Sequence, residues 1–150
     1  MTSPDQPSDQ PKEILLVEDS PSHQDLMLEA LAETCVSHKV HIVNNGEEAL
    51  EFLRQQNNYA AAPRPHLILL DLNMPRMDGR ELLAIVKADL DLKLIPIVVF
   101  TTSKAATDVI KSYGLHANCY ISKPSDIDKL FEFVKVIVNF WLNIVTLPPT

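Results

Sequence analysis

One acidic residue, Asp71, follows a wholly apolar run and is the first candidate for chemistry. The run at residues 67–70 is Leu-Ile-Leu-Leu, which is typical of a parallel strand buried on both faces. A charge at the end of such a strand is unfavourable unless it is paired, so a purely structural role does not explain Asp71. Pro75 and Gly79 then predict a loop that keeps Asp71 accessible before the next helix begins.

Further polar residues follow three other apolar runs. The carboxyl ends of parallel strands lie along one edge of a sheet, so groups that are distant in sequence can converge there. Three converging carboxylates repel one another unless a cation joins them, and oxygen ligands without His or Cys suit Mg²⁺. A lysine and a hydroxyl at the same edge could hold a phosphoryl group on Asp71. The residues concerned are Glu18 and Asp19 after residues 14–17, Thr101 after residues 95–100, and Lys123 after residues 119–121.

Each of these residues has an ordinary structural explanation when it is taken alone. The acidic pair could be favourable charges at a helix start, Thr101 a strand-end cap, and Lys123 a surface lysine. Only their joint occurrence at successive strand ends favours a functional site.

The elements that must position these groups alternate between strand and helix about five times. This alternation predicts an α/β fold, in which a doubly wound, five-stranded parallel sheet carries helices on both faces. The predicted strands are residues 14–17, 40–43, 67–70, 95–100 and 119–121. The predicted helix starts are Ser20, Asn45, Asp78 and Ser125 with Asp126. The first helix is expected to run to about Cys35, and Gly114 is expected to be the C′ residue that closes the fourth helix from just beyond its end.

The composition narrows the class of protein. The chain has 150 residues, of which 46% are hydrophobic, enough for one domain with a real core. The net charge is −7 and no basic run is present, which argues against nucleic acid as a direct partner. Cys35 and Cys119 fit no disulfide framework, so we expect two reduced, buried thiols in a cytoplasmic protein.

Both ends of the chain differ from its middle. Residues 1–11 carry three prolines and predict a disordered leader without the apolar segment of a secretion signal. Residues 130–147 are the most hydrophobic stretch, but charged residues and asparagines interrupt it, so we expect no membrane span. We expect residues 12–142 to be the folded domain, residues 143–150 to be a tail, and no room for a DNA-binding output domain.

Four motifs in order make this chain resemble the receiver domain of two-component response regulators. The resemblance covers roughly residues 12–142 and implies a flavodoxin- or CheY-like sheet with strand order 2-1-3-4-5. The motifs are Val17-Glu18-Asp19-Ser20, Leu70-Asp71-Leu72-Asn73-Met74-Pro75 with Met77-Asp78-Gly79, Thr101-Thr102-Ser103, and Tyr120-Ile121-Ser122-Lys123-Pro124.

The resemblance implies that Asp71 accepts a phosphoryl group from a histidine kinase in a Mg²⁺-dependent reaction. It implies that Asp19 binds the ion directly, Glu18 through water, Asp71 by its side chain and Asn73 by its backbone carbonyl.

The resemblance also implies a switch. Thr101 would be its hydroxyl, and Tyr120, which alone reads as a core residue, would swing inward after phosphorylation. Lys123 would pair with the phosphoryl oxygens, and its peptide bond to Pro124 would be cis. The surface around the fourth helix, fifth strand and last helix would then change.

A narrower resemblance is to the small response regulators that serve cyanobacterial phytochrome kinases. It rests on the chain length, on Phe140-Trp141-Leu142 and on Thr146-Leu147-Pro148. Thr102 is bulkier than the residue common at its place in the family, so we expect it to alter dephosphorylation.

The last helix has two apolar stripes at helical spacing, and a small monomer needs only one. The second stripe predicts a homodimer interface, unless the C-terminal tail covers it. The core stripe is Ile127, Leu130, Phe131, Val134, Ile137, Val138 and Trp141; the second stripe is Phe133, Val136 and Phe140.

Two other functions share this architecture. A Mg²⁺-dependent phosphatase that forms an aspartyl phosphate would need a second acid two residues after Asp71, where this chain has Asn73, which cannot transfer protons. A flavodoxin-like FMN-binding module would need a phosphate-cradling loop after the first strand, and the sequence has none. We therefore expect a signalling switch with at most slow autodephosphorylation.

Overall fold

Five parallel strands form one sheet in the order β2-β1-β3-β4-β5. The protein is represented by a computed structural model that describes residues 10–149. The predicted strand order is confirmed, and each strand lies within a few residues of its predicted position. The strands are β1 (Lys12–Val17), β2 (His38–Val43), β3 (Leu67–Leu70), β4 (Ile97–Thr101) and β5 (Cys119–Ser122).

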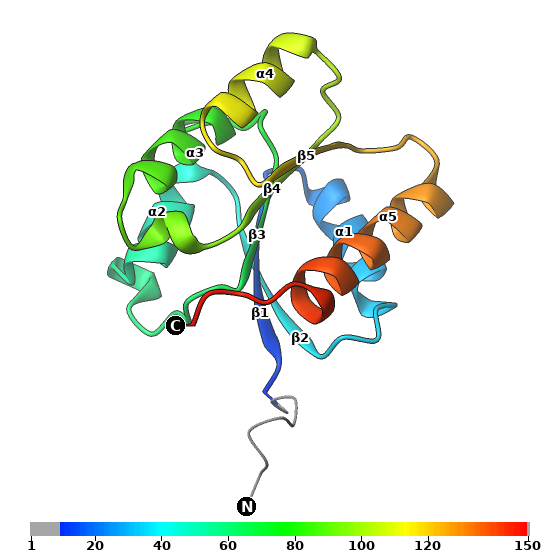
Figure 1. The fold of residues 1–150 in the computed structure, drawn as a ribbon, viewed down its shortest axis with the longest axis horizontal. Helices are drawn as coiled ribbons and strands as arrows, with labels where there is room; N and C mark the ends of the chain where they lie inside the picture. Colours follow the sequence, from blue (N-terminus) through cyan, green and yellow to red (C-terminus); the bar gives the residue numbers. More distant parts are fainter. Residues whose placement is uncertain (1–9, 150) are drawn as a thin grey trace, which may run out of the picture.

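Helices cover both faces of the sheet, as predicted. Figure 1 shows α1 and α5 on one face and α2, α3 and α4 on the other. The helices are α1 (Pro21–Ala32), α2 (Gly46–Arg54), α3 (Gly79–Ala88), α4 (Ala106–Gly114) and α5 (Ile127–Asn139). Short 3₁₀ turns lie at η1 (Asn57–Tyr59) and η2 (Leu92–Leu94), and a π-helical turn, η3 (Phe140–Ile144), follows α5.

Alternate residues of the strands build two separate cores. In β3, Ile68 and Leu70 face the core under α2 and α3, whereas Leu67 and Leu69 face the core under α1 and α5. All four residues are buried, which explains why the strand reads as an unbroken apolar run. Full burial of each such side chain contributes about 1.5–3 kcal/mol, so β3 is the rigid centre that holds Asp71 in place.

Side-chain caps begin the helices where the sequence predicted them. The Ser20 hydroxyl accepts from the His23 backbone N–H, and the Asn45 side chain accepts from the Glu48 N–H. Asp78 caps α3 by accepting from the Arg80 and Glu81 N–H groups. In α5 the cap is Asp126, not Ser125.

Three local predictions were wrong. Helix α1 ends at Ala32, before the expected Cys35, because the N–H groups of the next two residues turn back to carbonyls three residues earlier. Gly114 is the last residue of α4, and His116 adopts the left-handed conformation instead, with φ 71°. The Lys123–Pro124 peptide bond is trans, the form lower in free energy by about 0.5–1 kcal/mol.

The two cysteines are free, as expected, but neither is buried. Cys35 lies exposed after the end of α1, and Cys119 in the edge strand β5 is half-buried. The residue type alone predicts burial, but it carries no information on whether a position lies after a helix end or on an edge strand.

Most of the predicted core stripe of α5 is buried against the sheet, including Leu130, Val134, Ile137 and Val138. Ile127 is an exception, because it lies in the first turn of α5 and is 56% exposed. Up to Pro149, the tail leaves the second stripe exposed. Leu147 packs against the core instead, and with Pro148 and Pro149 it lines a hollow beside Arg64–His66 and Leu94–Pro96.

Within residues 10–149 no helix is both long enough and apolar enough to cross a membrane.

Candidate functional site

The carboxyl ends of β1 and β3 bring three carboxylates together. One oxygen from each of Glu18, Asp19 and Asp71 lies within 4.8 Å of the others. The Asp71 backbone N–H donates to the Val17 carbonyl at 3.1 Å, which continues the β1–β3 ladder into the site. The predicted convergence of these acids is therefore confirmed by their geometry. Three hard oxygen donors without a His or Cys ligand fit a divalent cation such as Mg²⁺ or Mn²⁺.

Asp71 is half-buried, and its Oδ1 atom is fully covered without a hydrogen-bond partner among the described residues. A buried polar atom normally has a partner, since leaving one unpaired costs about 1–3 kcal/mol. The acidic cluster around it makes this atom a natural ligand for a cation or an attacking oxygen.

Gly79 allows the loop after β3 to pack directly against the backbone of Asp71. Its N–H donates to the Leu72 carbonyl at 3.0 Å. A Cβ atom at this position would lie 2.8 Å from Leu72 Cα and would also overlap the Asp71 carbonyl oxygen. Only glycine fits without moving the loop that presents Asp71.

Lys123 reaches the site from the loop after β5, but it pairs with Glu18. Its ammonium donates to Glu18 Oε1 at 2.6 Å, and the side chains are 8% and 1% exposed. The same nitrogen lies 3.4 Å from His23 Nδ1 and 5.8 Å from the centre of the Phe100 ring. Lys123, Glu18, Phe100 and Asp71 line one narrow pocket, so Lys123 is within the site although Asp71 is not its partner here.

Thr101 ends β4 and is completely buried. Its Oγ1 accepts a long, 3.4 Å hydrogen bond from the Ser103 N–H. Thr102 is exposed and faces a cavity of about 310 Å³ that Lys123, His23 and Ile127 also line. Thr102 thus lies where it can affect access to the site.

Tyr120 lies in the edge strand β5 and is half-buried against the core under α2 and α3. Its hydroxyl donates to the Ser103 carbonyl at 2.9 Å, and Ser122 Oγ donates to the same oxygen at 3.2 Å. Asn73 is exposed in the loop after β3, beside the acidic cluster in sequence.

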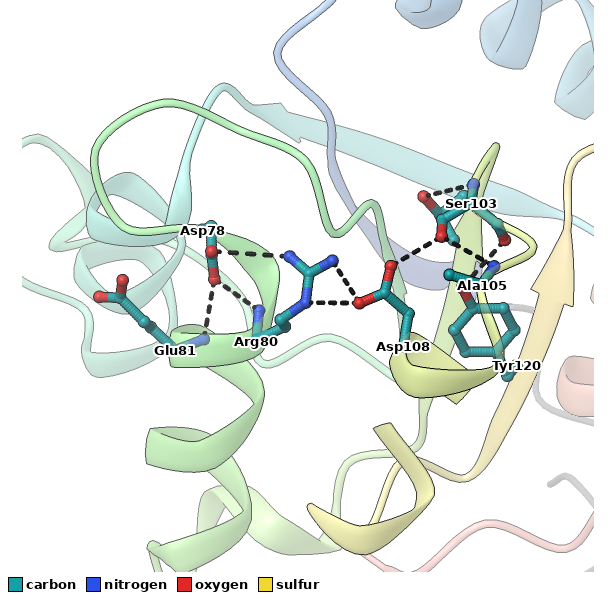
Figure 2. Close-up of polar contacts among 8 residues, drawn as sticks. Asp78, Arg80, Glu81, Ser103, Ala105, Asp108 and Tyr120 are labelled. Atoms are coloured by element: carbon teal, nitrogen blue, oxygen red, sulfur yellow. Dashed lines mark hydrogen bonds and ion pairs between the residues drawn. The ribbon is translucent and has the colours of Figure 1, made fainter. Parts of the chain in front are cut away.

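Sequence reasoning missed the roles of four residues in or next to this site: His23, Arg80, Ser103 and Asp108. His23 is the third residue of α1, and its Nδ1 lies 3.4 Å from Glu18 Oε1. Glu18 precedes the helix, so helical spacing does not predict this contact. Ser103 belongs to the Thr101-Thr102-Ser103 motif, but the motif alone assigns it no role. Asp108 accepts a hydrogen bond from the Ser103 hydroxyl, and Arg80 donates to Asp108 (Figure 2). The 28-residue separation of Arg80 and Asp108 gives no local signal.

A family profile described as the response regulator receiver domain matches residues 14–135. This chain belongs to that family of signalling switches.

Comparisons with individual proteins show which response regulators this chain resembles. Response regulator Rcp1 of Synechocystis sp. is 51% identical over 141 residues, which are 94% of this chain and 96% of that protein. The crystal structure of the phosphorylated cyanobacterial phytochrome response regulator RcpA is 51% identical and covers 93% of this chain and 100% of its own, with a TM-score of 0.89. The Mn²⁺-bound form of Rcp1 has the same identity and coverage, with a TM-score of 0.87.

Proposed function

We propose that this protein accepts a phosphoryl group on Asp71 from a histidine kinase of the phytochrome type. The observation that carries the proposal is the unpartnered Asp71 Oδ1 within a cluster of three carboxylates at the carboxyl edge of the sheet. The likeness to the phosphorylated and Mn²⁺-bound cyanobacterial relatives supports the same function.

The donor set supports Mg²⁺ as the cofactor. Asp19 and Asp71 would bind the ion by their side chains, Glu18 through a water molecule, and Asn73 by its backbone carbonyl. When bound, the ion neutralises negative charge on the carboxylates and on the incoming phosphoryl group.

The transfer itself needs no general base, because the Asp71 carboxylate is the nucleophile. A carboxylate oxygen forms a bond to the phosphorus of the kinase phosphohistidine, while the P–N bond breaks and its electron pair stays on the imidazole. Lys123 and Thr101 would hold the phosphoryl oxygens. Lys123 must then exchange its bond to Glu18 for one to the phosphoryl group.

This change of partner by Lys123 would accompany a change in the surface of the protein on phosphorylation. Thr101 would move toward the phosphoryl group, Tyr120 would swing inward, and the α4-β5-α5 face would change its shape. Autodephosphorylation would be slow because Asn73 cannot act as an acid or base, with Thr102 modulating the access of water.

The test is incubation with Mg²⁺ and either acetyl phosphate or a phosphorylated phytochrome kinase, followed by mass mapping. We expect one added phosphoryl group on Asp71, and none on the Asp71→Asn variant. The matched control Asp128→Asn removes an exposed carboxylate of α5 and should be modified normally. Modification at another residue would exclude the proposed acceptor. Equal rates from an unrelated histidine kinase would exclude the phytochrome partnership.

We further propose a homodimer built on Phe133, Val136 and Phe140 of the α5 and η3 region. These side chains are 38%, 63% and 46% exposed. Sedimentation at micromolar concentration should give a dimer, and Val136→Glu should give a monomer because it places a charge in an apolar interface. Ile110→Glu, on the exposed side of α4, is the matched control. A monomeric wild type, with and without phosphorylation, would contradict this proposal.

We assign the receiver to residues 12–142 and the tail to residues 143–150, in a protein that works in the cytoplasm, where its kinase would present the phosphohistidine. Residues 1–9 of the predicted leader lie outside the described residues.

A further inference from the structure

The turn between β2 and α2 spans residues 44–46 and contacts both loops that carry the proposed metal ligands, although it supplies none of those ligands itself. On the side of β1 the contact is made by Gln24 of α1. Its side-chain amide donates to the Glu18 carbonyl at 2.6 Å and to Asn44 Oδ1 at 2.9 Å. One side chain thus joins the turn to the loop after β1, which carries Asp19.

Asn44 is held in place by the first turn of α2. Its backbone N–H donates to Glu48 Oε2 at 2.8 Å, and its side-chain amide donates to the same oxygen at 3.3 Å. The neighbouring Val43 carbonyl accepts from the Glu18 N–H at 3.0 Å. The turn is therefore fixed to α2 on one side and to the acidic end of β1 on the other.

Gly46 makes the second contact, with the loop between β3 and α3. Its N–H donates to the Met77 carbonyl at 2.9 Å. A Cβ atom at Gly46 would lie 2.7 Å from both the carbonyl oxygen and Cγ of Met77, and 2.9 Å from Met77 Cβ. The carbonyl oxygen and Cβ do not move when the side chain changes rotamer, so any larger residue here must displace the backbone of the loop. The same loop contains Asn73, whose carbonyl is a proposed Mg²⁺ ligand.

We propose that residues 44–46 position both metal-binding loops, and that Gln24 and Gly46 are the positioning residues through which they do so. The proposal rests on the function proposed above, in which the loops after β1 and β3 hold Mg²⁺. Mg²⁺ requires short distances and near-octahedral geometry, whereas Ca²⁺ accepts longer and more variable distances. Displacing the ligands should therefore cost more affinity for Mg²⁺ than for Ca²⁺.

Gly46→Ala tests the contact with the β3–α3 loop. It should weaken Mg²⁺ binding by roughly tenfold, as is usual when residues that orient metal ligands are changed, and it should weaken Ca²⁺ binding less. Isothermal titration of the unphosphorylated protein measures both dissociation constants. The matched control is Gly114→Ala, whose Cβ atom meets nothing within 4 Å and which should leave both constants unchanged.

Gln24→Ala tests the contact with the loop after β1. It removes both hydrogen bonds, but water can replace the amide at the Glu18 carbonyl, so the loss of Mg²⁺ affinity should be smaller than in Gly46→Ala. The matched control is Gln55→Ala. Gln55 also donates its side-chain amide to a backbone carbonyl, that of Ala62 at 2.7 Å, but it lies at the other end of α2 and should not affect either ion.

The ratio of the two affinities separates positioning of ligands from a purely structural role. A weaker affinity for Mg²⁺ together with a smaller preference for Mg²⁺ over Ca²⁺ supports the proposal. A lower free energy of unfolding in urea with both dissociation constants unchanged would make the turn a structural contact only and would overturn the proposal. Equal losses for the two ions would overturn it as well, because they indicate general loosening rather than displaced ligands.

The same titrations keep this proposal distinct from the function on which it rests. If wild type binds Mg²⁺ but takes up no phosphoryl group on Asp71, the proposed function fails, and the variants still decide whether the turn positions the ligands. If wild type binds no Mg²⁺, both proposals fail. If Gly46→Ala does not fold, Gln24→Ala decides by the same criteria.

Discussion

Lys123 and Glu18 form a buried ion pair, with Lys123 Nζ 2.6 Å from Glu18 Oε1. The two residues are 105 positions apart in sequence and come from opposite ends of the domain. The pair gives the acidic cluster a cation of its own and ties the loop after β5 to the loop after β1. It also means that the lysine proposed to hold the phosphoryl group already has a partner. A phosphoryl group carries more negative charge than one carboxylate, which is the physical reason for the lysine to change partners.

Removing this lysine should destabilise the fold. Lys123→Met leaves the Glu18 charge buried without its cation, and we expect a loss of about 3 kcal/mol in the free energy of unfolding. The loss in the double variant Lys123→Met with Glu18→Gln should be smaller than the sum of the single losses. Urea unfolding measures all three. The matched control is Lys135→Met, which breaks a half-exposed pair with Glu33 and should change stability by less than about 1 kcal/mol. Equal losses at both lysines would contradict a special role for the buried pair.

The lysine that stabilises the fold should weaken Mg²⁺ binding, because its positive charge repels the ion. Lys123→Met removes a positive charge beside three carboxylates, so Mg²⁺ should bind more tightly and raise the melting temperature by more than in wild type. Asp19→Asn should abolish most of the rise in melting temperature that Mg²⁺ causes in the wild type. Thermal unfolding over a Mg²⁺ titration makes the comparison, with Asp25→Asn, outside the cluster, as control. An undiminished rise in Asp19→Asn would place the ion elsewhere.

Two glycine-to-alanine substitutions should change the free energy of unfolding in opposite directions. Gly79→Ala places a methyl group against the Asp71 backbone and should destabilise the protein and lower phosphoryl uptake, because the loop must move. Gly114→Ala meets nothing within 4 Å, and the backbone there is not left-handed. At the end of α4 it should stabilise by about 0.4–1 kcal/mol and leave uptake unchanged. Urea unfolding and acetyl phosphate labelling test both variants, and equal effects would refute the argument from close approach.

What the sequence predicted well follows from backbone periodicity. The carboxyl ends of parallel strands must meet at one edge, so the sequence alone predicts that Glu18, Asp19 and Asp71 lie close together. The partner of Lys123 could not be inferred, because three acids lie within reach and only packing chooses among them. The contact between Arg80 and Asp108 depends on how α3 and α4 sit side by side, which no local pattern encodes. The exposure of Cys35 depends in the same way on where α1 ends.

Stability should fall as the pH drops below about 6.5, and His66 should be one cause. His66 Nδ1 accepts a hydrogen bond from the Glu13 N–H at 2.9 Å, which requires that atom to be unprotonated. Burial lowers the pKa of His66 from its ordinary value of 6.5; nearby Lys12 lowers it further, and Glu13 partly opposes the shift. Between the folded and unfolded pKa values the unfolded chain binds more protons, so the free energy of unfolding rises with pH across this interval and falls when the pH is lowered through it.

The difference between wild type and His66→Gln isolates this effect from the other histidines. Glutamine does not titrate, so the variant should lose less stability than wild type between pH 7.5 and pH 5.5, as measured by urea unfolding. The matched control is His116→Asn, which removes an exposed histidine and keeps a residue type that tolerates the left-handed backbone there. Identical pH dependence in wild type and His66→Gln would show that protonation of His66 does not oppose folding, and that the β1–β3 contact at Glu13 survives the charge.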